Sequence, residues 1–318
     1  MLVTGGAGFI GSNLVESFLL SGNYVVCLDN FSTGKRENLK EFENNPKFKL
    51  IEGDIRNYND CVRAVENIEI VFHQAALGSV PRSIIDPVTT TDVNIGGFVK
   101  MLFAAKESGV KRFIYAASSS TYGDHSDLPK VEDKIGSPLS PYAVTKYVDE
   151  LFSTIFSKTY GIDIIGLRYF NVFGRRQDPD GAYAAVIPKF VKMLMNHQVP
   201  VINGDGSVSR DFTYIDNVIH INHLAAIVNN KEALNQIYNV AHGQRTTLSQ
   251  LFYYLREQLG KFDKDILNIQ PLYGPSRAGD IAHSLASIEK AKMLLGYSPF
   301  LNVEEGLEEA VKWYWNNL

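Results

Sequence analysis

The chain has 318 residues, of which 45% are hydrophobic and 21% are charged, and its formal net charge at pH 7 is -4. This length suits two domains with a sizeable core, and the slightly acidic balance argues against a nucleic-acid partner. Cys27 and Cys61 lack the spacing of a CxxC or Cys/His site, so we expect buried thiols and no metal. No apolar run reaches the about 20 residues that span a bilayer, and the chain opens on a strand, so we expect a cytoplasmic protein.

The N-terminal stretch predicts a dinucleotide-binding loop. A short apolar strand, Leu2 to Thr4, leads into GGAGFIG, and an amphipathic run from Ser12 to Leu20 follows. Glycines at Gly5, Gly8 and Gly11 let backbone amides approach a pyrophosphate held at a helix N-terminus.

The next strand indicates which dinucleotide binds. It runs from Tyr24 to Leu28 and ends at Asp29, where a carboxylate can accept hydrogen bonds from ribose hydroxyls. A carboxylate there repels a 2′-phosphate, which favours NAD over NADP. Lys35 and Arg36 are the opposing signal, although they lie further into the loop and suit a solvated surface.

Strand and helix patterns then alternate, which predicts a doubly wound parallel α/β sheet of the Rossmann type with ligands at the carboxyl ends of its strands. Asp54, His73 and Ser118 stand at such ends. A histidine at such a place is more often structural than catalytic. The expected strands are Phe48 to Ile51, Ile70 to His73, Arg112 to Ala117 and Ile164 to Phe170, and the expected helices are Tyr58 to Glu66, Asn94 to Ser108 and Pro141 to Tyr160.

After residue 171 this rhythm loosens, so we expect a smaller C-terminal α/β lobe that binds substrate. We assign residues 1–171 to the NAD-binding domain, with 211–241 returning to it, and 172–318 mainly to the smaller lobe. The expected elements are helices Ala184 to Asn196, Asp216 to Asn229, Thr247 to Leu259, Ser287 to Leu295 and Val303 to Trp315, and strands Val199 to Asn203 and Ile237 to Val240, the latter returning to the main sheet.

The stretch SPYAVTK carries the candidate chemistry. Ser140 can cap a helix and Pro141 suits its first turn, so Tyr142 and Lys146 share one helical face. A tyrosine hydroxyl titrates near about pH 10, so a phenolate base at neutral pH needs about 4 kcal/mol of stabilisation. An adjacent ammonium and a cationic nicotinamide ring can supply it.

Two helices have more apolar surface than one sheet can cover. In residues 94–108 and 141–160, one apolar stripe can face the sheet, and a second stripe is left over. We therefore expect a homodimer that pairs these helices.

Taken together, these motifs resemble the extended short-chain dehydrogenase/reductase superfamily and, within it, the UDP-hexose 4-epimerases that act on N-acetylated sugars. The resemblance covers essentially the whole chain, although the first strand is shorter than is usual. It rests on GGAGFIG with Asp29, DI at 54–55, HQAA at 73–76, SSSTYG at 118–123, YAVTK at 142–146, LRYFNVFG at 167–174 and RAGD at 277–280.

The resemblance implies a role for each matching residue. Tyr142 would take the proton from the sugar C4 hydroxyl, Lys146 would hold the nicotinamide ribose, and Ser118, with Ser119 beside it, would bind the reacting oxygen. The implied NAD contacts are Gly5, Gly8, Phe9, Ile10, Gly11, Asp29, Asn30, Ser32, Thr33, Gly34, Asp54, Ile55, Ala75, Ala76, Asn94, Tyr142, Lys146 and Tyr169. The implied UDP-sugar contacts are Gly78, Ser79, Ser118, Ser120, Asn171, Ala185, Val186, Asn203, Arg210, Arg277, Asp280 and Ser284.

The chemistry of C4 agrees with these roles. C4 carries no acidic hydrogen, so inversion requires loss of a hydride to NAD, a 4-keto sugar that turns over, and return of the hydride to the other face. NAD is regenerated in each turnover and should stay tightly bound.

The neighbouring residues narrow the reaction and the substrate. Related 4,6-dehydratases carry acidic residues at Ser119 and Ser120, and related decarboxylases carry Glu at the second place, whereas this chain has hydroxyls only. Ser284 stands where epimerases restricted to plain hexoses carry tyrosine, which leaves space for an N-acetyl group. The alternatives are another NAD-dependent sugar-nucleotide enzyme and, more remotely, a non-catalytic NAD-sensing module.

Overall fold

A computed structural model describes residues 1–180, 184–276 and 282–318. Its centre is a parallel sheet of seven strands in the order β11-β6-β5-β4-β1-β2-β3, which confirms the predicted doubly wound fold. Strands are added to one side of β1 first and then, from β4 onward, to its other side. Ligands of such sheets bind at the point between β1 and β4 where this order changes. The strands are β1 (Leu2–Thr4), β2 (Val25–Asp29), β3 (Phe48–Glu52), β4 (Ile70–His73), β5 (Arg112–Ser118), β6 (Asp163–Tyr169) and β11 (Gln236–Val240).

Each strand sends alternate side chains to two apolar layers. Val3 and Ile114 face one layer, whereas Leu2 and Phe113 face the other, because successive side chains of a strand point to opposite faces. Against the sheet, the first layer contains α1 (Phe9–Leu20) and α8 (Ile215–Ile227), and it continues into the C-terminal helices. The second layer contains α2 (Tyr58–Ala64), α5 (Phe98–Glu107) and α6 (Pro141–Tyr160).

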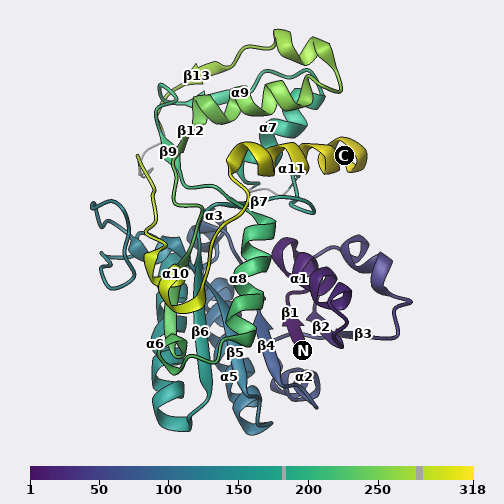
Figure 1. The fold of residues 1–318 in the computed structure, drawn as a ribbon, viewed down its shortest axis with the longest axis vertical. Helices are drawn as coiled ribbons and strands as arrows, with labels where there is room; N and C mark the ends of the chain where they lie inside the picture. Colours follow the sequence, from purple (N-terminus) through teal and green to yellow (C-terminus); the bar gives the residue numbers. More distant parts are fainter. Residues whose placement is uncertain (181–183, 277–281) are drawn as a thin grey trace.

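The C-terminal half adds a smaller group of elements beyond the carboxyl ends of the strands. Figure 1 shows α7, α9 and β13 gathered at one end of the long axis, with the main sheet at the other. Strand β11 belongs to the main sheet, where it pairs with β6. The group consists of α7 (Val186–Met195), β8 (Val201–Asn203), β9 (Ser209–Arg210), β12 (Thr246–Thr247), α9 (Leu248–Leu259), β13 (Leu272–Gly274) and α11 (Val303–Asn317), while α10 (Glu289–Leu295) packs near β11.

Between β4 and α5 the structure differs from the sequence expectation. Two short helices, α3 (Val80–Ile85) and α4 (Pro87–Thr91), were not predicted, and the expected helix from Asn94 begins instead as a π-helix, Asp92–Gly97. Helix α1 also begins earlier than expected, at Phe9, directly after the glycine loop.

Cys27 and Cys61 are free and buried, as expected, and burial raises the pKa of Cys61 to about 12. Among the described helices we find none with the length and apolar character of a membrane span. The described residues also contain no group of three or more His, Cys, Asp or Glu side chains placed to hold a metal ion.

Candidate active site

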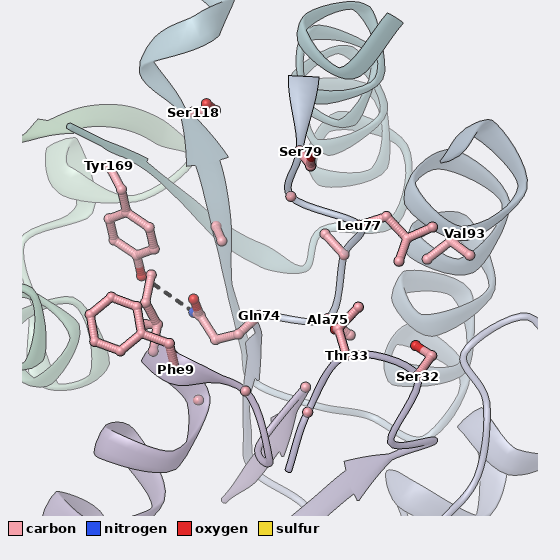
Figure 2. A pocket seen from close by; sticks show the side chains of 18 of the residues that line it. Phe9, Ser32, Thr33, Gln74, Ala75, Leu77, Ser79, Val93, Ser118 and Tyr169 are labelled. Atoms are coloured by element: carbon pink, nitrogen blue, oxygen red, sulfur yellow. Dashed lines mark hydrogen bonds between the residues drawn. The ribbon is translucent and has the colours of Figure 1, made fainter. Parts of the chain in front are cut away.

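A cavity of about 780 Å³ lies at the carboxyl ends of the central strands. Figure 2 shows side chains from the start of α1, the loop after β2, the segment after β4, and the ends of β5 and β6 converging on it. The predicted residues that line it are Gly5, Gly8, Phe9, Ile10, Gly11, Asp29, Asn30, Ser32, Thr33, Gly34, Asp54, Ile55, Ala75, Ala76, Gly78, Ser79, Ser118, Ser119, Tyr142, Lys146, Tyr169, Asn171 and Ala185.

The glycine loop is tight because backbone lies where side chains would otherwise be. Gly5 has a φ of +66°, and a Cβ there would lie 2.8 Å from Ala75 Cα. A Cβ on Gly11 would lie 2.1 Å from the carbonyl oxygen of Gly5. Gly8 caps α1, so the first free amides of this helix open onto the cavity, which suits a pyrophosphate.

The carboxylate at the end of β2 is held by backbone amides. Asp29 accepts hydrogen bonds from Ala7 N at 2.9 Å and from Phe31 N at 2.8 Å. Burial raises the pKa of Asp29, and these backbone donors oppose that shift. The carboxylate is therefore fixed at the rim where the ribose of a dinucleotide is expected.

A second carboxylate, that of Asp54, lines the same cavity. Asp54 accepts a hydrogen bond from Asn30 Nδ2 at 2.8 Å. Its bonds to Arg56 lower the pKa of Asp54 to about 2, so this group is ionised at neutral pH.

Lys35 and Arg36, the two cations that would favour NADP, each form an ion pair with an acidic side chain. Lys35 Nζ lies 3.0 Å from Asp178 Oδ1, and Arg36 Nη2 lies 2.6 Å from Glu52 Oε2. Both pairs are exposed and contribute little stability, but they add negative charge close to each cation. This arrangement fits NAD better than a cofactor with an added phosphate.

Helix α6 begins as the sequence predicts. Ser140 Oγ accepts a hydrogen bond from Ala143 N at 3.1 Å, and Pro141 occupies the first turn. Tyr142 is further held by its backbone N, which donates to Ser83 Oγ at 3.1 Å on the unpredicted helix α3. Both Tyr142 and Lys146 line the cavity.

The hydroxyl of Ser118 is oriented by its neighbour. Ser118 Oγ accepts hydrogen bonds from Ser120 Oγ at 2.9 Å and from Ser120 N at 3.2 Å. A hydroxyl has two acceptor positions and one hydrogen, so Ser118 keeps its hydrogen to donate to a group in the cavity.

His73 has a structural role here. Its Nδ1 lies 2.9 Å from Thr4 Oγ1, and its ring packs against Phe98 and Phe113. Burial lowers the pKa of His73 to about 3, so it stays neutral. The next residue, Gln74, does reach the cavity and donates to the Tyr169 hydroxyl at 3.3 Å (Figure 2).

Several predicted contacts lie outside the cavity lining. Asn94 is buried behind the lining, where its side chain bonds Leu77 and Thr145. Ser120 acts on Ser118, as described above. Four predicted residues of the smaller lobe also lie outside the cavity lining, namely Val186, Asn203, Arg210 and Ser284. Arg277 and Asp280 lie outside the described residues.

Arg210 and Ser284 are nevertheless brought close to each other. Ser284 N donates to the carbonyl oxygen of Ser209 at 3.1 Å, next to Arg210. The adjoining Asp211 is buried, with its pKa raised by burial to about 7, and it accepts hydrogen bonds from Ala286 N and from His242 N, both at 3.1 Å. Strand β9 and the segment after residue 281 are thus fixed to one another.

The structure adds lining residues that the sequence did not single out. They include Gln74, Leu77, Arg82, Val93, Gln177 and Asp178. Gln74 and Leu77 flank the predicted pair Ala75 and Ala76, so the strand end was a usable signal. No local pattern marks Gln177 or Asp178, which reach the cavity from the crossing to the smaller lobe.

The sequence model of the NAD dependent epimerase/dehydratase family matches residues 1–241. The chain belongs to this family. Membership agrees with the glycine loop, with Asp29 and with the paired phenol and ammonium.

Relatives within the epimerase/dehydratase family cover the full chain. A putative UDP-glucose 4-epimerase of Methanocaldococcus jannaschii is 36% identical over 320 residues, which is 100% of this chain and 99% of that protein. A UDP-N-acetylglucosamine 4-epimerase from Methanobrevibacter ruminantium, solved with UDP-N-acetylmuramic acid, is 39% identical with a TM-score of 0.92 and covers 100% of this chain and 98% of its own. A UDP-glucuronic acid 4-epimerase from Bacillus cereus, solved with UDP-glucuronic acid and NAD, is 33% identical with a TM-score of 0.89 and covers 99% and 98%.

Proposed function

We propose that this protein is a UDP-sugar 4-epimerase that interconverts UDP-GlcNAc and UDP-GalNAc. One observation carries the proposal: Ser118, Tyr142 and Lys146 line the same cavity as the dinucleotide loop. A protein that only senses NAD has no use for a base, a cation and a hydroxyl donor beside the nicotinamide position.

Each of these residues has a step in the reaction. The redox chemistry would come from NAD held at the glycine loop and Asp29, which would take up the hydride of sugar C4 and return it to the opposite face. Tyr142 takes the proton of the C4 hydroxyl and later gives it back. Lys146 stabilises the phenolate that this requires, and Ser118 donates its hydrogen bond to the C4 oxygen as that oxygen becomes a carbonyl.

The residues next to Ser118 disfavour elimination. Ser119 lines the cavity, and Ser120 is committed to Ser118 through two hydrogen bonds. Neither can act as the additional acid or base that loss of water from the sugar requires. These residues therefore favour a 4-epimerase over a dehydratase.

Small residues support the preference for N-acetylated sugars. A Cβ on Gly78 would meet no heavy atom within 4 Å, so this wall of the cavity is open. Ala185 lines the same cavity, and Ser284 places a short side chain beside Arg210. We propose that residues 172–210 and 242–318 mainly bind the UDP-sugar, and that Arg210 and Arg277 supply cations for the diphosphate.

The function is tested by incubating the purified protein with UDP-GlcNAc in D₂O and separating the products. We expect UDP-GalNAc of unchanged mass, since the hydrogen at C4 never exchanges with water. A product lighter by one water would show a dehydratase, and deuterium at the inverted C4 would contradict the hydride mechanism. Absence of any product from UDP-hexoses, with NAD bound, would favour an NAD-sensing module.

We also propose a homodimer formed through α5 and α6. The buried side of these helices carries Phe98, Leu102 and Phe156, which pack on the sheet. Their other side exposes a second apolar set, and burying such a set in a self-complementary interface is favourable. The exposed residues are Phe103, Val144, Leu151, Ile155 and Tyr160.

Multi-angle light scattering tests this assembly. We expect a mass twice that of the 35.5 kDa chain at micromolar concentration. Ile155→Lys, at an exposed position, should shift the mass to that of one chain. A monomer for the unmodified protein would exclude the dimer.

A further inference from the structure

Behind the cavity, Lys146 contacts a carboxylate to which the proposed mechanism gives no role. Lys146 Nζ donates to the carbonyl oxygen of Ala116 at 2.9 Å and lies 3.4 Å from Asp149 Oδ2. The side chains of Lys146 and Asp149 are only 3% and 1% exposed, so solvent screens their interaction little. Asp149 is therefore the close counter-charge of the cation that Tyr142 requires.

The carboxylate of Asp149 accepts fewer hydrogen bonds than those of Glu150 and Asp211, which are also buried. Its second oxygen, Oδ1, is buried and has no hydrogen-bond partner in the part of the chain that the structure describes. By contrast, Glu150 directs its two oxygens to Arg168, at 2.8 Å each, and Asp211 accepts bonds from several backbone amides. Burial raises the pKa of Asp149 to about 7, and Lys146 only partly opposes this shift.

Charged and titratable groups face Asp149 from several elements. On α6 it faces Lys146 and Glu150, and the latter is compensated by Arg168 of β6. From β5 it faces Tyr115, where burial raises the pKa of the phenol well above its usual value. From β4, His73 lies near Lys146, and the pKa of this histidine is lowered to about 3 by burial.

We propose that Asp149 is a positioning residue that holds the Lys146 ammonium in place and moderates its electrostatic effect on Tyr142. This inference rests on the roles proposed above for Tyr142 and Lys146. An ionised Asp149 offsets part of the positive potential at the phenol, whereas a neutral Asp149 leaves the ammonium uncompensated. The base strength of Tyr142 is thus coupled to the charge of a residue that does not touch the substrate.

The test is the pH profile of kcat/KM for Asp149→Asn, measured on the holoenzyme with UDP-GlcNAc or UDP-glucose. Asparagine keeps the shape and an acceptor oxygen for Lys146 but removes the charge. Without the counter-charge the phenolate forms more readily, so we expect the acidic limb to move about one pH unit lower. The NAD content and the KM for the UDP-sugar should remain within about twofold, because Asp149 does not line the cavity.

A matched control removes a carboxylate elsewhere. Asp163→Asn changes a partly exposed residue at the opposite end of β6, which lies 3.9 Å from Arg112, and it should leave the profile unchanged. Asp149→Ser, which also removes the charge but has a smaller side chain, should shift the limb in the same direction as Asp149→Asn and serves if the asparagine variant does not fold.

The outcomes separate this inference from the proposed function. A profile of either Asp149 variant that superimposes on that of Asp163→Asn, with the unmodified enzyme active, overturns the role of Asp149 alone. An unmodified protein that epimerises no UDP-hexose overturns the proposed function, and the role of Asp149 with it.

Discussion

Replacing Tyr142 with phenylalanine is expected to lower kcat about 1,000-fold while NAD stays bound. The phenol is the proposed base for the C4 hydroxyl, and removing a general acid–base group typically costs this much. The rest of the cofactor site is unchanged, since the glycine loop, Asp29 and Lys146 remain. Turnover of UDP-GlcNAc and the NAD released on denaturation are the two measurements.

The same helix offers a matched control for this change. Tyr147→Phe removes a hydroxyl five residues further along α6, at a position outside the cavity lining, and should keep near-normal turnover. Normal turnover by Tyr142→Phe would exclude Tyr142 as the base. Loss of NAD together with activity would mean that the phenol acts in binding.

Replacing Ser284 with tyrosine is expected to depress turnover of UDP-GlcNAc about 100-fold and to spare UDP-glucose. Ser284 is half-buried, and its backbone N is bonded to Ser209 O, so a large ring there cannot move away with the backbone. Ser284 lies beyond the cavity lining, so we expect the longer tyrosine ring to extend into the space of a bound C2 acetamido group and to discriminate between substrates by about one to two orders of magnitude. Product separation with both sugar pairs gives the ratio.

Ser284→Ala is the control for this steric argument. It removes the hydroxyl without adding volume, so both sugar pairs should turn over nearly as before. If Ser284→Tyr loses both activities equally, position 284 does not select the C2 substituent, and the preference for N-acetylated sugars has another origin.

Sequence patterns predicted which residues of the proposed dinucleotide site lie around one cavity, because their signals are local. Gly5, Gly8 and Gly11 fall within one short stretch of sequence, and Asp29, Asp54 and Ser118 lie at the end of a strand or shortly after it, so alternation and parallel topology were sufficient to predict that they lie close together. The common face of Tyr142 and Lys146 could also be predicted from the sequence, because it follows from their spacing on a capped helix.

The missed helices had local signals, but they also depend on tertiary contacts. Ser79 and Asp86 cap α3 and α4, and a proline occupies the first turn of each. Five or six residues are too few to show helical periodicity or to be stable alone. Their support comes from elsewhere in the chain, as in the bond from Tyr142 N to Ser83 Oγ.

Contacts between segments far apart in sequence could not be predicted either, because they too depend on the tertiary structure. The pair of Lys35 with Asp178 joins the first domain to the crossing segment, and nothing near either residue indicates it. The contact of Lys146 with Asp149 spans only one helical turn, but its importance depends on burial, which spacing alone does not reveal.

The pairing of β11 with β6 constrains how the protein is made on the ribosome. Until Val240 has left the exit tunnel, β6 has an open edge, because its neighbour on that side is encoded after the first elements of the smaller lobe. The hydroxyl of Tyr169 likewise gains its hydrogen bond from Asn222 Nδ2, at 3.0 Å, only after residue 222 has been synthesised. The main sheet is therefore completed only after α7, β8 and β9 have been synthesised, so the N-terminal half cannot finish folding before synthesis of the C-terminal half has begun.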